Sequence, residues 1–206
     1  TRTATFTPGR DAARKEASKL NVPRIGVRFR LPASMNQVEY FGRGPAENYL
    51  DRNAGSMVGL YKSTAEELYF PYVRPQENGH HTDTRWVSLS TGKKGLLIQA
   101  DNTIGFNALR NSIEDFDDEE ATGLSRQWSN FTPEQVANHD EAAAKNVLRR
   151  QHHINNITPR DFVEVCVDLK QQGVAGYDSW GSRPEPAYTL PANREYNWGF
   201  TLIPLK

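Results

Sequence analysis

A six-residue loop carries the side chains in this sequence that are best suited to contact a small polar ligand. It reads Gly176-Tyr177-Asp178-Ser179-Trp180-Gly181, with prolines at positions 184 and 186. A flat indole ring matches the apolar face of a pyranose, and neighbouring Asp and Ser side chains can bind hydroxyl groups. We therefore interpret Trp180, Asp178 and Ser179 as candidate substrate-binding residues for a sugar. The alternative is that Trp180 plugs the core beneath the loop.

No residue stands out as catalytic or as a metal ligand. Enzymes that hydrolyse glycosides use two carboxylates, but none of the 25 acidic residues here lies in a local arrangement that singles out such a pair. The pairs His80–His81 and His152–His153 are acid-base or metal candidates. Adjacent residues on a strand point to opposite faces, so each pair offers at most one ligand in a given direction. We assign no catalytic residue and no metal site.

Composition narrows the classes of partner. The 206 residues suffice for one sizeable domain, and the 25 basic and 25 acidic side chains cancel. This balance disfavours nucleic acid and anionic membranes, and it leaves a neutral small molecule or a protein. The single cysteine, Cys166, cannot form an intramolecular disulfide and is expected to be buried. We expect no membrane span and no signal peptide, and a start at Thr1 suggests an excised fragment whose compartment stays unassigned.

The elements that must position the loop are short strands. Alternation of apolar and polar residues, with turn-forming residues between the segments, favours an all-β antiparallel sandwich. Two strands place branched or aromatic side chains on one face, which we expect to form the core: Val163, Val165, Val167 and Leu169, and Tyr196, Trp198, Phe200 and Leu202. The predicted strands are Arg24–Leu31, Gln37–Phe41, Thr84–Ser90, Gly95–Ala100, Phe162–Leu169 and Tyr196–Ile203.

The predicted domain organisation has two parts. Residues 1–22 form a linker that leads into the fold, and residues 23–206 form the β-sandwich domain, with an insertion at 114–150. The acidic run Glu114–Glu120 indicates a solvated loop. After it, Thr132-Pro133 followed by Gln135 has the layout of a capped helix start. The insertion is therefore expected to be a helical segment on the surface.

Several segments, in the same order, resemble the C-terminal domain of bacterial β-galactosidases of glycoside hydrolase family 2, the small-chain or fifth-domain type. The resemblance extends from Pro23 to Leu205. It rests on PRIGVRF from Pro23, YFGRGPAENYLDR from Tyr40, PYVRPQENG from Pro71, TRW from Thr84 and GYDSWG from Gly176.

This resemblance implies a large sandwich of the galactose mutarotase-like (supersandwich) kind, in an enzyme that removes terminal β-linked galactose in the bacterial cytoplasm or periplasm. The family's catalytic glutamates lie in a separate barrel domain, so this chain alone is expected to be inactive. Any Mg²⁺ or Na⁺ is expected in that barrel, and no cofactor in this chain. Trp180 matches the family's tryptophan that stacks on the leaving-group side. Tyr177 departs from the more common Gly-Gly-Asp form of the loop.

Two other functions remain open. One is a free-standing aldose epimerase on the same fold, which requires one of the four histidines named above to face Glu77 or another acid across a cleft. The other is a structural domain that buries interface area in a larger enzyme, which predicts exposed apolar patches. The resemblance segments also hold polar residues that we expect to pair with each other and to cap turns: Arg43, Glu47, Asn48, Asp51, Arg52, Glu77, Asn78 and Arg85.

Overall fold

The computed structural model describes residues 2–6, 21–73, 75–116, 154, 157–178 and 181–206. Contacts divide the chain into two compact units. The first comprises Thr1–Phe70, Asn78–Arg110 and Asp161–Lys206, and the second comprises Pro71–Glu77 and Asn111–Arg160. The first unit holds every strand of the described residues and the described part of the candidate loop, so it is the unit that matters for the site.

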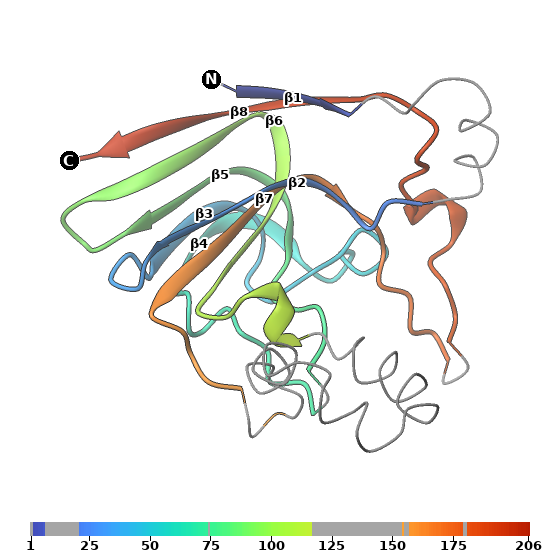
Figure 1. The fold of residues 1–206 in the computed structure, drawn as a ribbon, viewed down its shortest axis with the longest axis horizontal. Helices are drawn as coiled ribbons and strands as arrows, with labels where there is room; N and C mark the ends of the chain where they lie inside the picture. The colour runs from blue at the N-terminus through green and yellow to red at the C-terminus, as the bar shows by residue number, and fades with distance from the viewer. Residues whose placement is uncertain (1, 7–20, 74, 117–153, 155–156, 179–180) are drawn as a thin grey trace, which may run out of the picture. The chain divides into compact units, whose positions relative to one another are not determined.

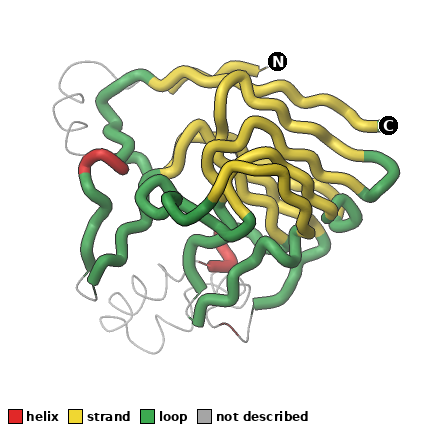
Figure 2. Tube along the Cα trace, turned by 180° about the vertical axis from the view of Figure 1, so that it is seen from behind, coloured by secondary structure: helices red, strands yellow, loops and turns green. Residues whose placement is uncertain are grey.

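Eight antiparallel strands build the described part of the first unit (Figure 1). They are β1 Arg2–Phe6, β2 Arg24–Pro32, β3 Gln37–Gly44, β4 Met57–Thr64, β5 His81–Ser90, β6 Gly95–Leu109, β7 Phe162–Gln171 and β8 Tyr196–Leu205. A short 3-10 helix, η3 (Pro186–Tyr188), lies between β7 and β8. Figure 2 shows the strands as one group joined by loops at their ends. The predicted all-β antiparallel fold is confirmed.

Strand β6 organises the sheet because it changes partner along its length. One side of β6 pairs with β5, and the order continues through β3 to the edge strand β4. On its other side, Gly95–Ala100 pairs with β8 and Gly105–Leu109 pairs with β7, which in turn pairs with β2. Figure 1 shows the two resulting pairs, β1 beside β8 and β2 beside β7. The sheet therefore branches at β6.

The two faces of β6 and β7 have opposite character. On one face, Phe106, Val165 and Val167 are fully buried and form part of the apolar core. On the other face lie Asn107 and Asp168, which are also buried. Alternation along a strand produces this division, since successive side chains point to opposite sides. Asn78 and His80 cover part of this polar face, since both contact Asn107.

The six strands expected from the sequence are all present, and each extends beyond its expected bounds, most of all β6, which ends at Leu109 and not at Ala100. β4 was not predicted, and β1 lies in the stretch that we assigned to a linker. Tyr196, Trp198 and Phe200 are buried as expected, and so is Cys166, whereas Leu202 is 43% exposed. Its position in the core was wrong because it lies toward the end of β8, beyond the part of the strand that the core covers.

In the second unit, the 3-10 helix η1 spans Ile113–Phe116 and holds the first residues of the acidic run. Glu114 is exposed as expected, but Asp115 is buried, so the prediction of a solvated loop is wrong at this residue. The Asp115 carboxylate pairs with Arg160 and accepts a hydrogen bond from the Ser112 backbone N–H at 2.9 Å. The predicted helical insertion beyond Phe116 falls on residues 117–150, which lie outside the described residues. No helix among the described residues is long and apolar enough to cross a membrane.

Candidate carbohydrate-contact loop

The candidate loop follows β7 and precedes η3. Its described backbone contains three residues with positive φ: Ala175 at 54°, Gly176 at 83° and Gly181 at 80°. A side chain at Gly176 or Gly181 would meet nothing within 4 Å, so the left-handed backbone, not crowding, is what favours glycine there. The backbone N–H of Tyr177 donates to the Ser182 hydroxyl at 3.1 Å and thereby ties the two ends of the loop together.

Of the three residues predicted to bind sugar, the structure places one. Asp178 is exposed at the surface of the loop, whereas Ser179 and Trp180 lie outside the described residues. Tyr177, which immediately precedes Asp178, was not predicted as a contact residue, yet the residue is 57% exposed. The described part of the loop therefore presents one aromatic ring and one carboxylate to solvent.

The Tyr177 hydroxyl lies in an acidic environment. Desolvation raises the pKa of the Tyr177 hydroxyl, and the charges of Asp51 and Glu185 raise it further, while a hydrogen bond with the Glu185 backbone opposes the rise. The net effect favours the protonated hydroxyl, which can donate a hydrogen bond. A protonated phenol close to carboxylates offers both donors and acceptors, which is the mixture that binds sugar hydroxyl groups.

The stem of the loop is anchored by a distant turn. The Val174 N–H donates to Asp51 Oδ1 at 3.1 Å, and the Ala175 N–H donates to Asp51 Oδ2 at 2.7 Å. Asp51 belongs to the sequence Gly42–Arg52, more than 120 residues earlier in the chain. Pairing between these two segments is a property of the tertiary structure, because no sequence spacing indicates it.

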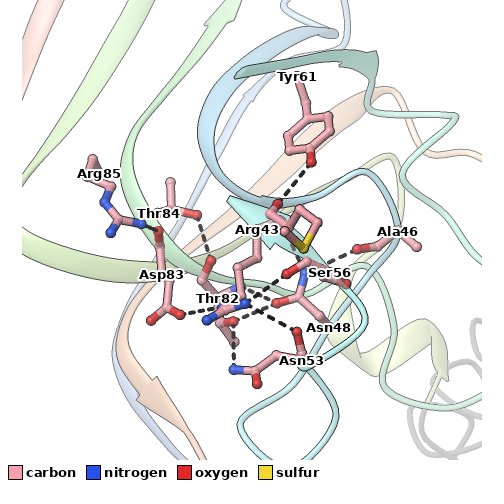
Figure 3. A network of polar contacts seen from close by, with 11 residues as sticks. Arg43, Ala46, Asn48, Asn53, Ser56, Tyr61, Thr82, Asp83, Thr84 and Arg85 are labelled. Atoms are coloured by element: carbon pink, nitrogen blue, oxygen red, sulfur yellow. Dashed lines mark hydrogen bonds and ion pairs between the residues drawn. The ribbon is translucent and has the colours of Figure 1, made fainter. Parts of the chain in front are cut away.

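The Gly42–Arg52 segment is itself held by a buried polar network (Figure 3). The side chain of Asn48 is fully buried and donates to the carbonyl oxygens of Arg43 and Ala46, both at 3.1 Å. Its Oδ1 accepts from the backbone N–H of Thr82 at 2.9 Å and from the Thr82 hydroxyl at 2.6 Å. One amide thus closes its own turn and joins that turn to β5.

Charged residues reinforce the same segment. Arg43 pairs with Asp83 at 2.5 Å and donates to the carbonyl oxygen of Ser56 at 2.8 Å. Glu47 pairs with Arg52 at 3.0 Å and accepts from the Gly79 N–H at 2.7 Å. These contacts confirm that Arg43, Glu47, Asn48 and Arg52 pair with charged groups or hold backbone turns, whereas Asp51 binds the backbone of the loop stem instead of capping its own turn.

The first histidine pair is buried and neutral. His80 Nδ1 lies 2.8 Å from Asn107 Oδ1, while the Asn107 amide group donates to the Asn78 carbonyl at 2.8 Å. Asn107 Oδ1 must therefore accept, which places the hydrogen of His80 on Nδ1. Burial, with the charge of Arg24 as a second cause, lowers the pKa of His80 to about 3.

His81 contacts a different set of groups. Its ring lies 5.0 Å from the ring centroids of both Tyr40 and Phe106, and burial lowers its pKa as well. His80 and His81 are each only 1% exposed, so neither faces solvent as the acid of an epimerase would. His152 and His153 lie outside the described residues. Within the described residues, no group of three or more His, Cys, Asp or Glu side chains could hold a metal ion.

Comparison with known proteins points to one group of enzymes. A family model described as β-galactosidase small chain matches residues 3–202. A β-galactosidase of Priestia megaterium is 35% identical over 185 residues, which is 89% of this chain and 15% of the relative. A β-galactosidase of an Arthrobacter species is 40% identical over 111 residues, which is 51% of this chain and 11% of the relative. A β-galactosidase of Vibrio cholerae is 29% identical over 181 residues, which is 88% of this chain and 14% of the relative. The chain thus spans about 15% or less of the length of these relatives.

Proposed function

Because this chain belongs to the β-galactosidase small-chain family, we propose that it is an accessory domain of an enzyme that hydrolyses terminal β-D-galactosides. In this proposal, the Gly176–Gly181 loop contacts the sugar on the aglycone side of the active site. The observation that carries the proposal is the anchored loop, whose stem is bonded to Asp51 while Tyr177 and Asp178 remain exposed. A preformed loop loses less conformational entropy on binding than a mobile one.

The roles proposed for the loop are contacts, not bond cleavage. Trp180 is proposed to stack on the apolar face of a pyranose, and Asp178 and Ser179 to bind its hydroxyl groups. Tyr177 adds a second exposed ring beside them. The catalytic carboxylates, and any Mg²⁺ or Na⁺, are proposed to come from another domain of the parent enzyme.

The test is a titration of the purified chain with lactose, glucose and galactose, followed by ligand-observed NMR and tryptophan fluorescence. Trp180→Ala and Asp178→Asn should each weaken saturable binding, by about tenfold for the ring if stacking contributes roughly 1 to 2 kcal/mol. Asp101→Asn is the matched control, because Asp101 is also exposed but lies on β6. Absence of saturable binding by the wild-type chain would count against a preformed sugar site.

A specific observation also favours an interface role in the same enzyme. The register places Leu60 of β4 opposite Phe41 of β3, which in turn lies opposite Trp86 of β5, so these side chains form an apolar row across three strands. Leu60 is 59% exposed and Phe41 38%, and Val58, which lies on the same face of β4 as Leu60, is 41% exposed. We propose that another domain of the parent enzyme covers this row, since the relatives are several times longer than this chain.

Hydrogen exchange tests this second role. Amides of residues 57–62 should exchange more slowly in a full-length enzyme that contains this chain than in the isolated 206-residue chain. Amides of the Thr91–Lys94 turn, whose residues are exposed, serve as the reference that should not change. Equal exchange of residues 57–62 in the two proteins would exclude a covered β4 edge.

A further inference from the structure

We propose that Asp51 is a positioning residue for sugar binding, which holds the stem residues Val174 and Ala175 that lead into Tyr177 and Asp178 and does not touch the ligand itself. This inference rests on the proposed function of the loop. It goes beyond that function because Asp51 lies in a separate segment and had only been expected to cap a turn. Its carboxylate accepts two backbone hydrogen bonds from consecutive residues, Val174 and Ala175.

Asp51 is itself placed firmly. It lies in a turn that is closed by reciprocal backbone bonds, from the Arg52 N–H to the Tyr49 carbonyl at 2.8 Å and from the Tyr49 N–H to the Arg52 carbonyl at 3.2 Å. Tyr49 is fully buried, and its ring stacks on His80 with centroids 5.7 Å apart. The carboxylate therefore projects from a turn that is fixed to the core.

The stem of the loop receives a continuous series of anchors. The Gln172 N–H donates to the Pro23 carbonyl at 2.9 Å, and the Gly173 N–H donates to the Tyr188 carbonyl at 2.8 Å. Asp51 binds the next two N–H groups, so four successive backbone donors have partners. The last of them belongs to Ala175, whose φ of 54° is unfavourable for a residue with a side chain. The 2.7 Å bond to Asp51 offsets that strain at the point where the chain turns toward Tyr177.

Close packing fixes the same contact from the loop side. A Cβ added at Gly173 would lie 2.5 Å from the Asp51 carboxylate carbon and from Oδ2. Only glycine lets the stem approach closely enough for both hydrogen bonds to form. Gly173 and Asp51 are therefore expected to act as one unit, which a double-mutant cycle can detect.

The experiment compares Asp51→Asn, Asp51→Ala, Gly173→Ala and the double variant Asp51→Ala/Gly173→Ala with the wild-type 206-residue chain. Two quantities are measured: amide exchange of residues 172–177 by NMR, and affinity for lactose by ligand-observed NMR. Circular dichroism verifies that each variant is folded. Glu67→Gln is the matched control, because Glu67 also accepts a backbone N–H, that of Thr64 at 2.9 Å, but in the turn after β4.

Asp51→Asn should accelerate exchange at Val174 and Ala175 about tenfold, leave β7 amides unchanged, and weaken lactose binding at least about fivefold. Gly173→Ala should weaken binding similarly in the wild-type background and add little in the Asp51→Ala background. Wild-type affinity in Asp51→Asn, alongside lost affinity in Trp180→Ala, would overturn the positioning role and leave the proposed function intact. Unchanged amide exchange at Val174 and Ala175 in Asp51→Asn would overturn the positioning role, whether or not lactose binds. If the wild-type chain does not bind lactose, the proposed function itself is overturned.

Discussion

Replacement of Asn48 by alanine should destabilise the first unit more than any ordinary surface substitution. The side chain is fully buried and makes four hydrogen bonds, two as donor to Arg43 and Ala46 and two as acceptor from Thr82. A buried hydrogen bond contributes about 1 kcal/mol net, so the four together give about 4 kcal/mol. Asparagine loses side-chain rotamer freedom on folding and alanine does not, so the expected loss of stability falls to about 3 kcal/mol.

The free energy of unfolding is measured by urea titration with circular dichroism. For a protein of this size, a loss of about 3 kcal/mol corresponds to a fall in Tm of roughly 6 to 12 °C. Asn193→Ala is the control, because Asn193 is exposed in the turn before β8, and its effect should stay within about 0.5 kcal/mol.

Asn48→Asp separates the two halves of the network. The carboxylate of this variant can still accept the hydrogen bonds from Thr82. It has no N–H donor, however, so an oxygen of the carboxylate lies against the carbonyl oxygens of Arg43 and Ala46 with no hydrogen bond to them. This variant should lose at least as much stability as Asn48→Ala at neutral pH, since a buried charge is added. A loss below about 1 kcal/mol in both variants would refute the argument that this amide joins the Gly42–Arg52 segment to β5.

Two further predictions concern His80. Burial holds its pKa at about 3, below the ordinary value of 6.5, so between these values the unfolded chain binds more protons than the folded one. The neutral His80 side chain contributes fully to stability above about pH 6.5, and this contribution is lost as the pH falls toward 3, by up to about 1.4 kcal/mol per pH unit. Urea titrations at pH 7, 5 and 4 measure this dependence of the free energy of unfolding on pH. His80→Gln should make the dependence weaker. Gly105→Ala would place a Cβ 2.5 Å from His80 Cε1 and should cost about 2 kcal/mol in the same assay. Gly55→Ala, whose added Cβ meets nothing within 4 Å, should be nearly neutral, and equal effects of the two glycine substitutions would contradict the packing argument.

The sequence by itself determined the fold class and most of the strands, for a local reason. Alternation of apolar with polar or small residues along Phe162–Gln171 and Tyr196–Leu205 marks the face that carries the apolar core, and that signal lies in neighbouring residues. Prediction of strands from the sequence failed where the alternation was weak. β4 carries exposed apolar residues at an edge, and β1 is a short stretch whose pairing with β8 depends on a partner about 190 residues away.

The sequence also marked the loop that carries Asp178, because an aromatic residue among glycines and polar side chains is a local pattern. Only the tertiary structure decided what holds that loop. The bonds from Asp51 to Val174 and Ala175 join residues more than 120 positions apart, and the hydrogen bonds of Asn48 join its turn to β5. Such pairings depend on how the strands are ordered in the sheet, and no local spacing in a chain encodes that order.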